Sequence, residues 1–139
     1  MERQLDGVWK MDNDRFKFRT PWYCGDKFAG FQYWEFEHGQ VKLIGDYWES
    51  WVSKRDELTA KPDEQCTGLY DKNGNLIYEN DYIKDKLGVT IYLIKWVDAK
   101  FINNDIDDMM PDTSPRQDWL DRFGFEIIGN VHGSAEQKE

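Results

Sequence analysis

The stretch Cys66–Lys84 reads CTGLYDKNGNLIYENDYIK and contains more structural signals than any other part of the chain. Asn73 and Gly74 sit in a polar turn, and both tolerate the positive φ that a tight hairpin turn requires. Residues 76–78 follow with strand-forming side chains, and residues 81–84 resume the apolar pattern after two polar positions. The stretch therefore predicts a tight turn followed by two short strands.

Downstream of this stretch lies the strongest strand signal in the chain. Val89–Val97 reads VTIYLIKWV and is rich in β-branched and aromatic residues. Short strands joined by short turns are typical of an antiparallel meander, and a small barrel is a common way to complete one. We therefore expect a mostly-β fold with minor α content, in which residues 66–131 form a partly open small β-barrel.

Upstream, residues 15–45 predict an N-terminal β-hairpin layer. Apolar and polar residues alternate over 16–20, and Pro21 is expected to end that strand because proline cannot donate to a sheet. Strands are expected at 31–37 and 41–44, on either side of a turn.

One short C-terminal helix is expected at 115–123. Ser114 is in place to cap it, and Pro115 would occupy the first helical position. Gly124 follows where a helix commonly ends in the left-handed conformation.

These elements fit a single domain over residues 1–132. Within it, residues 46–61 are compatible with either a helix or a loop, because their apolar residues have helical spacing while the second half is polar. Residues 125–131 predict the last strand, and residues 133–139 are expected to be a disordered tail.

Composition constrains the function. Acidic residues outnumber basic ones by 27 to 18, giving a net charge of −9. Direct binding to nucleic acid is not expected, because affinity for phosphate backbones comes mainly from Lys and Arg. The sequence has two well-separated cysteines and no apolar run long enough for a signal peptide or a membrane span. We therefore expect a cytoplasmic protein with reduced thiols and no contact with a membrane.

The central stretch also resembles a known family. Thr67–Gly74 and Ile77–Ile83 resemble the central motif of the YopX-type phage proteins, with Asn80 where the family has glycine. Three further segments are similar to other parts of the family pattern: Lys17–Arg19 with Trp22, Ile94–Trp96 and Phe125–Val131. The resemblance spans about residues 15–131. It implies a phage or prophage origin, hence a bacterial host, and a mostly-β fold; the family lacks an established activity.

No metal site is expected from the acidic loop. Asn103, Asp105 and Asp107 place side-chain oxygens at alternate positions, as in a calcium loop. However, Asp108 stands where the sharp turn needs glycine, and Ser114 where a bidentate glutamate belongs.

The sequence also offers little support for an enzyme. Cys24 with His38 and Cys66 with His132 are the available thiol–imidazole combinations, and neither has an evident third group to orient it. No ligand spacing is typical of zinc, and the glycines form no phosphate loop. We therefore expect no cofactor and no catalytic residues.

Aromatic residues around the central stretch are the best candidates for binding. Tyr70, Tyr78, Tyr82 and Trp96 alternate with polar residues. Exposed rings on small β-folds stack bases or dock extended peptides. The acidic charge favours a peptide or protein ligand.

The sequence predicts a non-enzymatic phage or prophage accessory protein that binds an unidentified protein, with a homo-oligomer as one form that it could take. One alternative is an acidic module that mimics or contacts nucleic acid. The other is an uncharacterised enzyme, which would require Cys24, His38 or Asp81 to converge on a deep pocket.

Overall fold

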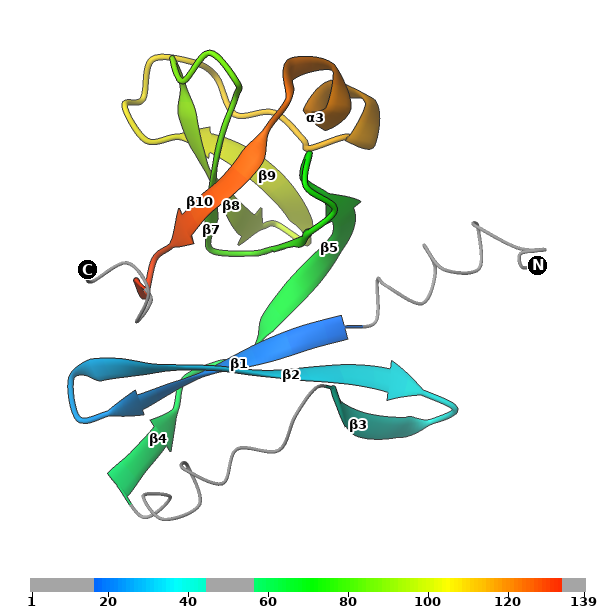
Figure 1. Cartoon of the computed structure of the whole chain (residues 1–139), viewed down its shortest axis with the longest axis vertical. Helices are drawn as coiled ribbons and strands as arrows, with labels where there is room; N and C mark the ends of the chain where they lie inside the picture. Colours follow the sequence, from blue (N-terminus) through cyan, green and yellow to red (C-terminus); the bar gives the residue numbers. More distant parts are fainter. Residues whose placement is uncertain (1–16, 45–56, 134–139) are drawn as a thin grey trace.

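The computed structural model describes residues 17–44 and 57–133, which form two sheets and one short helix (Figure 1). The helix is α3 (Gln117–Phe123). The strands are β1 (Lys17–Cys24), β2 (Lys27–Glu37), β3 (Gln40–Ile44), β4 (Leu58–Ala60), β5 (Glu64–Tyr70), β6 (Leu76–Tyr78), β7 (Asp81–Lys84), β8 (Ile91–Val97), β9 (Lys100–Asp105) and β10 (Glu126–Asn130). The expected mostly-β class with one short C-terminal helix is confirmed.

The first sheet contains the expected N-terminal hairpin layer. Its strand order is β3-β2-β1-β5-β6, and β4 pairs with the end of β1. The prediction that Pro21 ends the first strand is wrong. Pro21 pairs with Phe31 inside β1, and its carbonyl accepts a hydrogen bond from the Lys61 N–H at 2.9 Å. Proline lacks a backbone N–H but keeps its carbonyl, so the strand continues through Pro21 with the carbonyl accepting a hydrogen bond.

The second sheet has the order β10-β7-β8-β9. The expected barrel does not form, because β9 and β10 lie at opposite edges of this sheet and do not pair. The physical reason is a bend at Asn80, where φ is 73°. The bend leaves β5 and β6 in the first sheet and sends β7 into the second, so the central stretch joins two sheets instead of closing one. Asn80 thus adopts the left-handed conformation that glycine would adopt.

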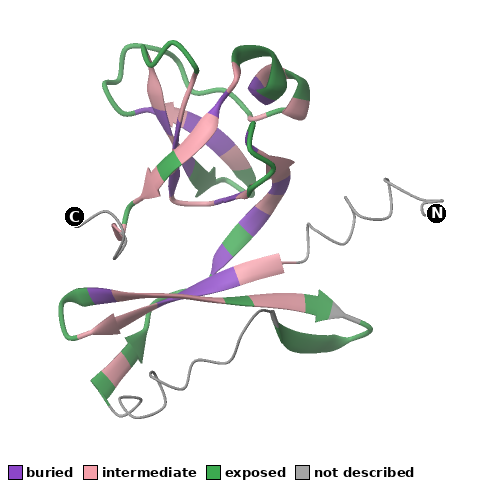
Figure 2. Ribbon diagram, viewed as in Figure 1, coloured by how far each residue is buried: buried purple, intermediate pink, exposed green. Residues whose placement is uncertain are grey.

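The main core lies between the second sheet, β6 and the helix (Figure 2). Its members are buried apolar residues from five elements or their ends: Ile77, Ile83, Tyr92, Ile94, Leu120 and Phe125. This core attaches α3 and the second sheet to the edge strand of the first sheet.

The helix begins later than predicted. Arg116 is the N-cap in an extended conformation, so Ser114 and Pro115 precede the helix and neither starts it. The end is as predicted: Gly124 is left-handed at φ 63°, and its N–H bonds to carbonyls of the last turn.

The remaining boundaries follow from the described residues. Most of 46–61 lies outside them, and the described part contains the strand β4. The predicted tail also lies outside them except for Gly133. In the part of the chain that is described, no helix is long and apolar enough to cross a membrane.

Candidate functional site

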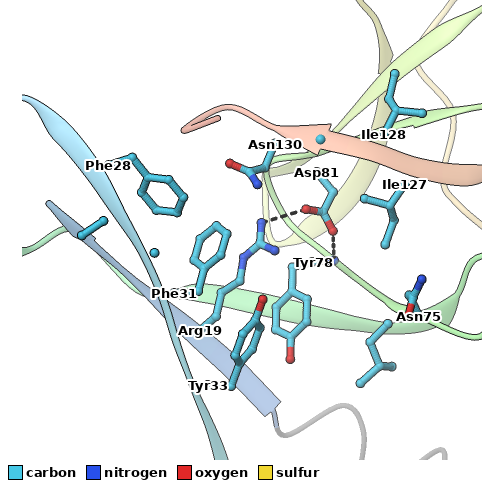
Figure 3. A pocket seen from close by; sticks show the side chains of 14 residues that line it. Arg19, Phe28, Phe31, Tyr33, Asn75, Tyr78, Asp81, Ile127, Ile128 and Asn130 are labelled. Atoms are coloured by element: carbon cyan, nitrogen blue, oxygen red, sulfur yellow. Dashed lines mark hydrogen bonds and ion pairs between the residues drawn. The ribbon is translucent and has the colours of Figure 1, made fainter. Parts of the chain in front are cut away.

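A groove of about 780 Å³ lies where the two sheets meet (Figure 3). One wall comes from β2, around Phe28–Phe31 and Tyr33, and the other from β10, around Ile127–Asn130. The turn and strand around Asn75–Tyr78 line a further side. Both sheets therefore contribute to one concave surface.

Arg19 lies in this groove with only 4% of its surface exposed. Its Nε donates to Glu64 Oε1 at 2.7 Å, and its Nη2 donates to Asp81 Oδ1 at 2.9 Å. The guanidinium also lies over the rings of Phe31 and Tyr78, 3.9 and 4.8 Å from their centroids. Arg19 thus joins β1 to both β5 and β7.

Glu64 extends this network toward the end of the described chain. Its Oε2 accepts the Asn80 amide at 2.8 Å and lies 2.5 Å from His132 Nε2. The other ring nitrogen, Nδ1, lies 2.6 Å from the hydroxyl of Tyr23. The His132 ring also stacks on Phe28. We call Arg19, Glu64, Asp81 and His132 the buried polar network.

The environment shifts the pKa values within this network. Burial raises the pKa of Asp81 to about 6, although the Arg19 charge and the Tyr78 N–H act in the opposite direction. Burial lowers the pKa of Arg19, but Asp81 and Glu64 more than offset this, so the pKa is raised overall. Arg19 and Asp81 therefore form an ion pair at neutral pH.

The chain of contacts from Tyr23 through His132 to Glu64 resembles a proton relay. Burial and the Glu64 charge raise the pKa of Tyr23, which disfavours the phenolate needed for a nucleophile. Glu64 is also paired with Arg19. These contacts join β1, β5 and the end of β10.

The model of the family described as YopX protein matches residues 50–137. The chain belongs to the YopX family. The match contains Glu64, Asp81 and His132, whereas Arg19 lies before it. No curated protein matches the chain.

The YopX motif at the centre of the chain has a clear structural role. Asp71 is buried; its Oδ1 accepts the N–H groups of Asn73 and Asn75, and its Oδ2 accepts that of Ile127. Gly74 supplies the positive φ of the turn, at 82°. Asn73, for which the sequence also allowed a positive φ, does not adopt one. The motif therefore fixes the turn against β10, one wall of the groove.

A β-bulge interrupts each of the two strand walls. The register of the β1–β2 pair shifts opposite Phe28 and Gly30, and that of the β10–β7 pair shifts between Ile127 and Gly129. Gly30 has a φ of 143°, which side-chain-bearing residues rarely adopt. Glycine in a strand marks places where another backbone can approach closely. The groove thus has backbone without side chains on both strand walls.

The four aromatic residues predicted for binding do not gather at one place. Of these four, Tyr78 is the one found among the described residues that line the groove. Tyr78 is only 5% exposed, so the expectation of an exposed ring is wrong for it, because its ring packs against Arg19 and Tyr33. That these four aromatic residues bind a ligand stays a prediction.

The other three lie elsewhere. The backbone of Tyr70 is bound on both its N–H and its carbonyl by the side chain of Gln117. Tyr82 is half-buried in β7. Trp96 is exposed and packs edge-to-face on Phe101 at 4.7 Å.

The candidate catalytic and metal residues also lie apart. Cys24 and His38 flank opposite ends of the eleven-residue β2, and Asp81 lies in the groove. Asp105, which the calcium-loop pattern singled out, accepts backbone N–H groups of its own loop. Among the residues described, no group of three or more His, Cys, Asp or Glu side chains could hold a metal ion.

Sequence reasoning missed most of the buried polar network. It named Asp81 as one of three residues that an enzyme would bring together, and Lys17–Arg19 as part of a family pattern. Nothing in the sequence pointed to Glu64, because an acid at a strand start is ordinarily solvated. The one available signal was Arg19 itself, a charged residue that lies between the aromatic residues Phe18 and Trp22 in the sequence.

Proposed function

We propose that the chain is a phage or prophage accessory protein that acts, without catalysis, by binding an extended segment of another protein inside the host bacterium. The observation that carries this proposal is the groove between the two sheets. Grooves between β-elements bind extended peptides through backbone contacts and pockets for side chains. The glycine bulges on both strand walls suit such a ligand.

The charged side chains that line the groove are paired with each other, which favours a ligand that carries little charge. Arg19 and Asp81 are the ionisable members of the lining apart from tyrosines, and they neutralise each other. The rest of the lining is aromatic, aliphatic, amide or glycine. A phosphate would find no unpaired cation among these residues. An apolar or amide-rich peptide would therefore be favoured over nucleic acid.

The two alternatives have less support. An enzyme would need Cys24, His38 or Asp81 to converge, and these residues lie apart. A nucleic-acid mimic would need acids spaced along an extended polar face, but the most exposed acidic loop also displays large apolar side chains.

Site-specific photo-crosslinking tests the proposal. Tyr33 lines the groove with 37% of its surface exposed, so p-benzoylphenylalanine can replace it with little change in size. Phe123, an exposed aromatic on the helix, is the matched control position. Both variants would be expressed in the bacterial host and irradiated, and the adducts identified by mass spectrometry.

The expected result is a protein adduct formed from position 33 and absent from position 123. The adducted peptide should be an extended, weakly charged segment. Adducts that form equally from both positions, or only with nucleic acid, would overturn the proposal.

A further inference from the structure

Two loops at the far end of the second sheet display five exposed large apolar side chains, including the three most exposed ones of the described chain. We call this set the apolar tip: Leu87, Val89, Ile106, Met109 and Met110. Their exposed fractions range from 46% at Ile106 to 80% at Met109. The loops lie side by side, because the Ile106 N–H donates to the Ile91 carbonyl at 3.1 Å (Figure 1).

The apolar tip is distant from the groove. β7 begins at Asp81 in the groove and ends at Lys84, just before the first loop. The tip and the groove therefore occupy opposite ends of the second sheet.

Internal hydrogen bonds fix both loops. Asp105 is buried; its Oδ2 accepts the N–H groups of Met109 and Met110, at 3.1 and 3.0 Å. In the other loop, Asp85 Oδ1 accepts the Val89 N–H at 3.1 Å, and the Asp85 carbonyl accepts the Gly88 N–H. The loops are therefore ordered before any partner binds, which lowers the entropic cost of association.

The second loop of the apolar tip is acidic. Asp107, Asp108 and Asp112 are exposed within the second loop. Two lysines lie at the first loop: the Cβ of Lys86 lies 3.2 Å from the position a Cβ on Gly124 would take, at the helix end, and the Cδ of Lys84 lies 3.8 Å from the position a Cβ on Gly88 would take. The acidic rim is therefore the one on the second loop. An apolar centre with an acidic rim complements an apolar pocket with a basic rim. It disfavours an anionic membrane surface, which would repel the rim.

We propose that the apolar tip is a second docking surface, which inserts into an apolar pocket rimmed by Lys and Arg on a partner protein. Exposed apolar patches with polar rims mark interaction sites, and methionine is enriched in them. This surface is separate from the groove. The inference does not depend on whether the groove binds a peptide.

The test begins with p-benzoylphenylalanine at Met110 to identify the partner in host cells, with Val41 as a control position on β3. The affinity of the purified partner is then measured by titration calorimetry. Leu87→Ser with Met109→Ser removes the apolar centre, and Val41→Ser with Leu43→Ser is the matched control at another exposed site. Asp107→Lys tests the rim, with Asp98→Lys in the β8–β9 turn as its control.

The tip double variant should bind at least about tenfold more weakly, because central apolar contacts dominate interface energies. Asp107→Lys should weaken binding severalfold, as should raising the salt concentration from about 50 to about 300 mM. Both control variants should bind like the unmodified protein, as should a groove variant such as Asn75→Trp. Unchanged thermal unfolding would show that all variants fold.

Four results would overturn the proposal. The first is that no protein is cross-linked from position 110, and the second is that the tip variants bind the partner normally. The third is tip-dependent sedimentation with vesicles of phosphatidylcholine and phosphatidylglycerol, which would assign the surface to membranes. The fourth is light scattering that shows self-association lost in the tip variant, which would assign it to a second copy of the chain.

Discussion

At the scale of single residues, Arg19 explains how the two described sheets, which have no strand in common, stay together. It is buried and binds Glu64 and Asp81, which come from different sheets. Burying three charged groups is unfavourable unless each finds a partner. Here the guanidinium supplies both carboxylates with a partner and packs between two aromatic rings.

Arg19→Met should therefore destabilise the fold strongly. The variant leaves Glu64 and Asp81 buried without their cation, and removing one partner of a buried ion pair costs about 3–5 kcal/mol. The free energy of unfolding from urea titration measures the effect. Lys42→Met is the control, because the Lys42–Glu35 pair is exposed at 3.8 Å and its loss should cost less than about 1 kcal/mol. Equal effects of the two substitutions would contradict the role given to Arg19.

The raised pKa of Asp81 predicts that the stability of the fold depends on pH. Its pKa is about 6 in the folded chain and near 3.8 when exposed, so the folded state binds more protons between these values. The contribution of Asp81 to the free energy of unfolding must then fall as pH rises from about 4 to 6. The full difference corresponds to about 3 kcal/mol.

The measurement is the free energy of unfolding of the unmodified chain minus that of Asp81→Asn, followed from pH 4 to pH 7. This difference should decrease as pH rises. An increase with pH for Asp81→Asn would mean that the pKa of Asp81 is lowered by folding.

At the scale of elements, turns and caps explain which strands meet. The sequence predicted the Asn73-Gly74 turn, the Gly124 helix end and the strands around them, because each depends on local backbone preferences. It did not predict the bend at Asn80 as a change of sheet. The change of sheet depends on the contacts of Arg19 with Glu64 and Asp81, which lie more than forty positions away in the sequence.

The helix end offers a test of local strain. Gly124→Ala places a side chain at φ 63° and a Cβ 3.2 Å from Lys86 Cβ. Gly74→Ala meets the same kind of backbone strain at φ 82° but no atom within 4 Å. The second variant should lose about 1 kcal/mol of stability, and the first should lose more. Chemical denaturation compares them, and a smaller loss at Gly124 would count against the packing of Lys86 on the helix end.

At the scale of the whole molecule, two sheets joined at one bend create a groove that neither sheet has alone. The sequence predicted an aromatic binding surface in a mostly-β domain, but it placed the rings in a barrel. The groove instead takes Phe28, Phe31 and Tyr33 from the N-terminal layer. Such a surface depends on how distant strands pack, which the hydrophobic pattern of each strand does not specify.

The groove between the two sheets is the surface that we propose binds the partner. Its most direct test is the dissociation constant of the partner cross-linked from position 33, measured for Asn75→Trp and Asn73→Trp. Both residues are exposed in the same turn, but only Asn75 is among the groove-lining residues described. Asn75→Trp should fill the mouth of the groove and weaken binding at least about tenfold, while Asn73→Trp should bind normally. Equal affinities for the two variants would contradict it.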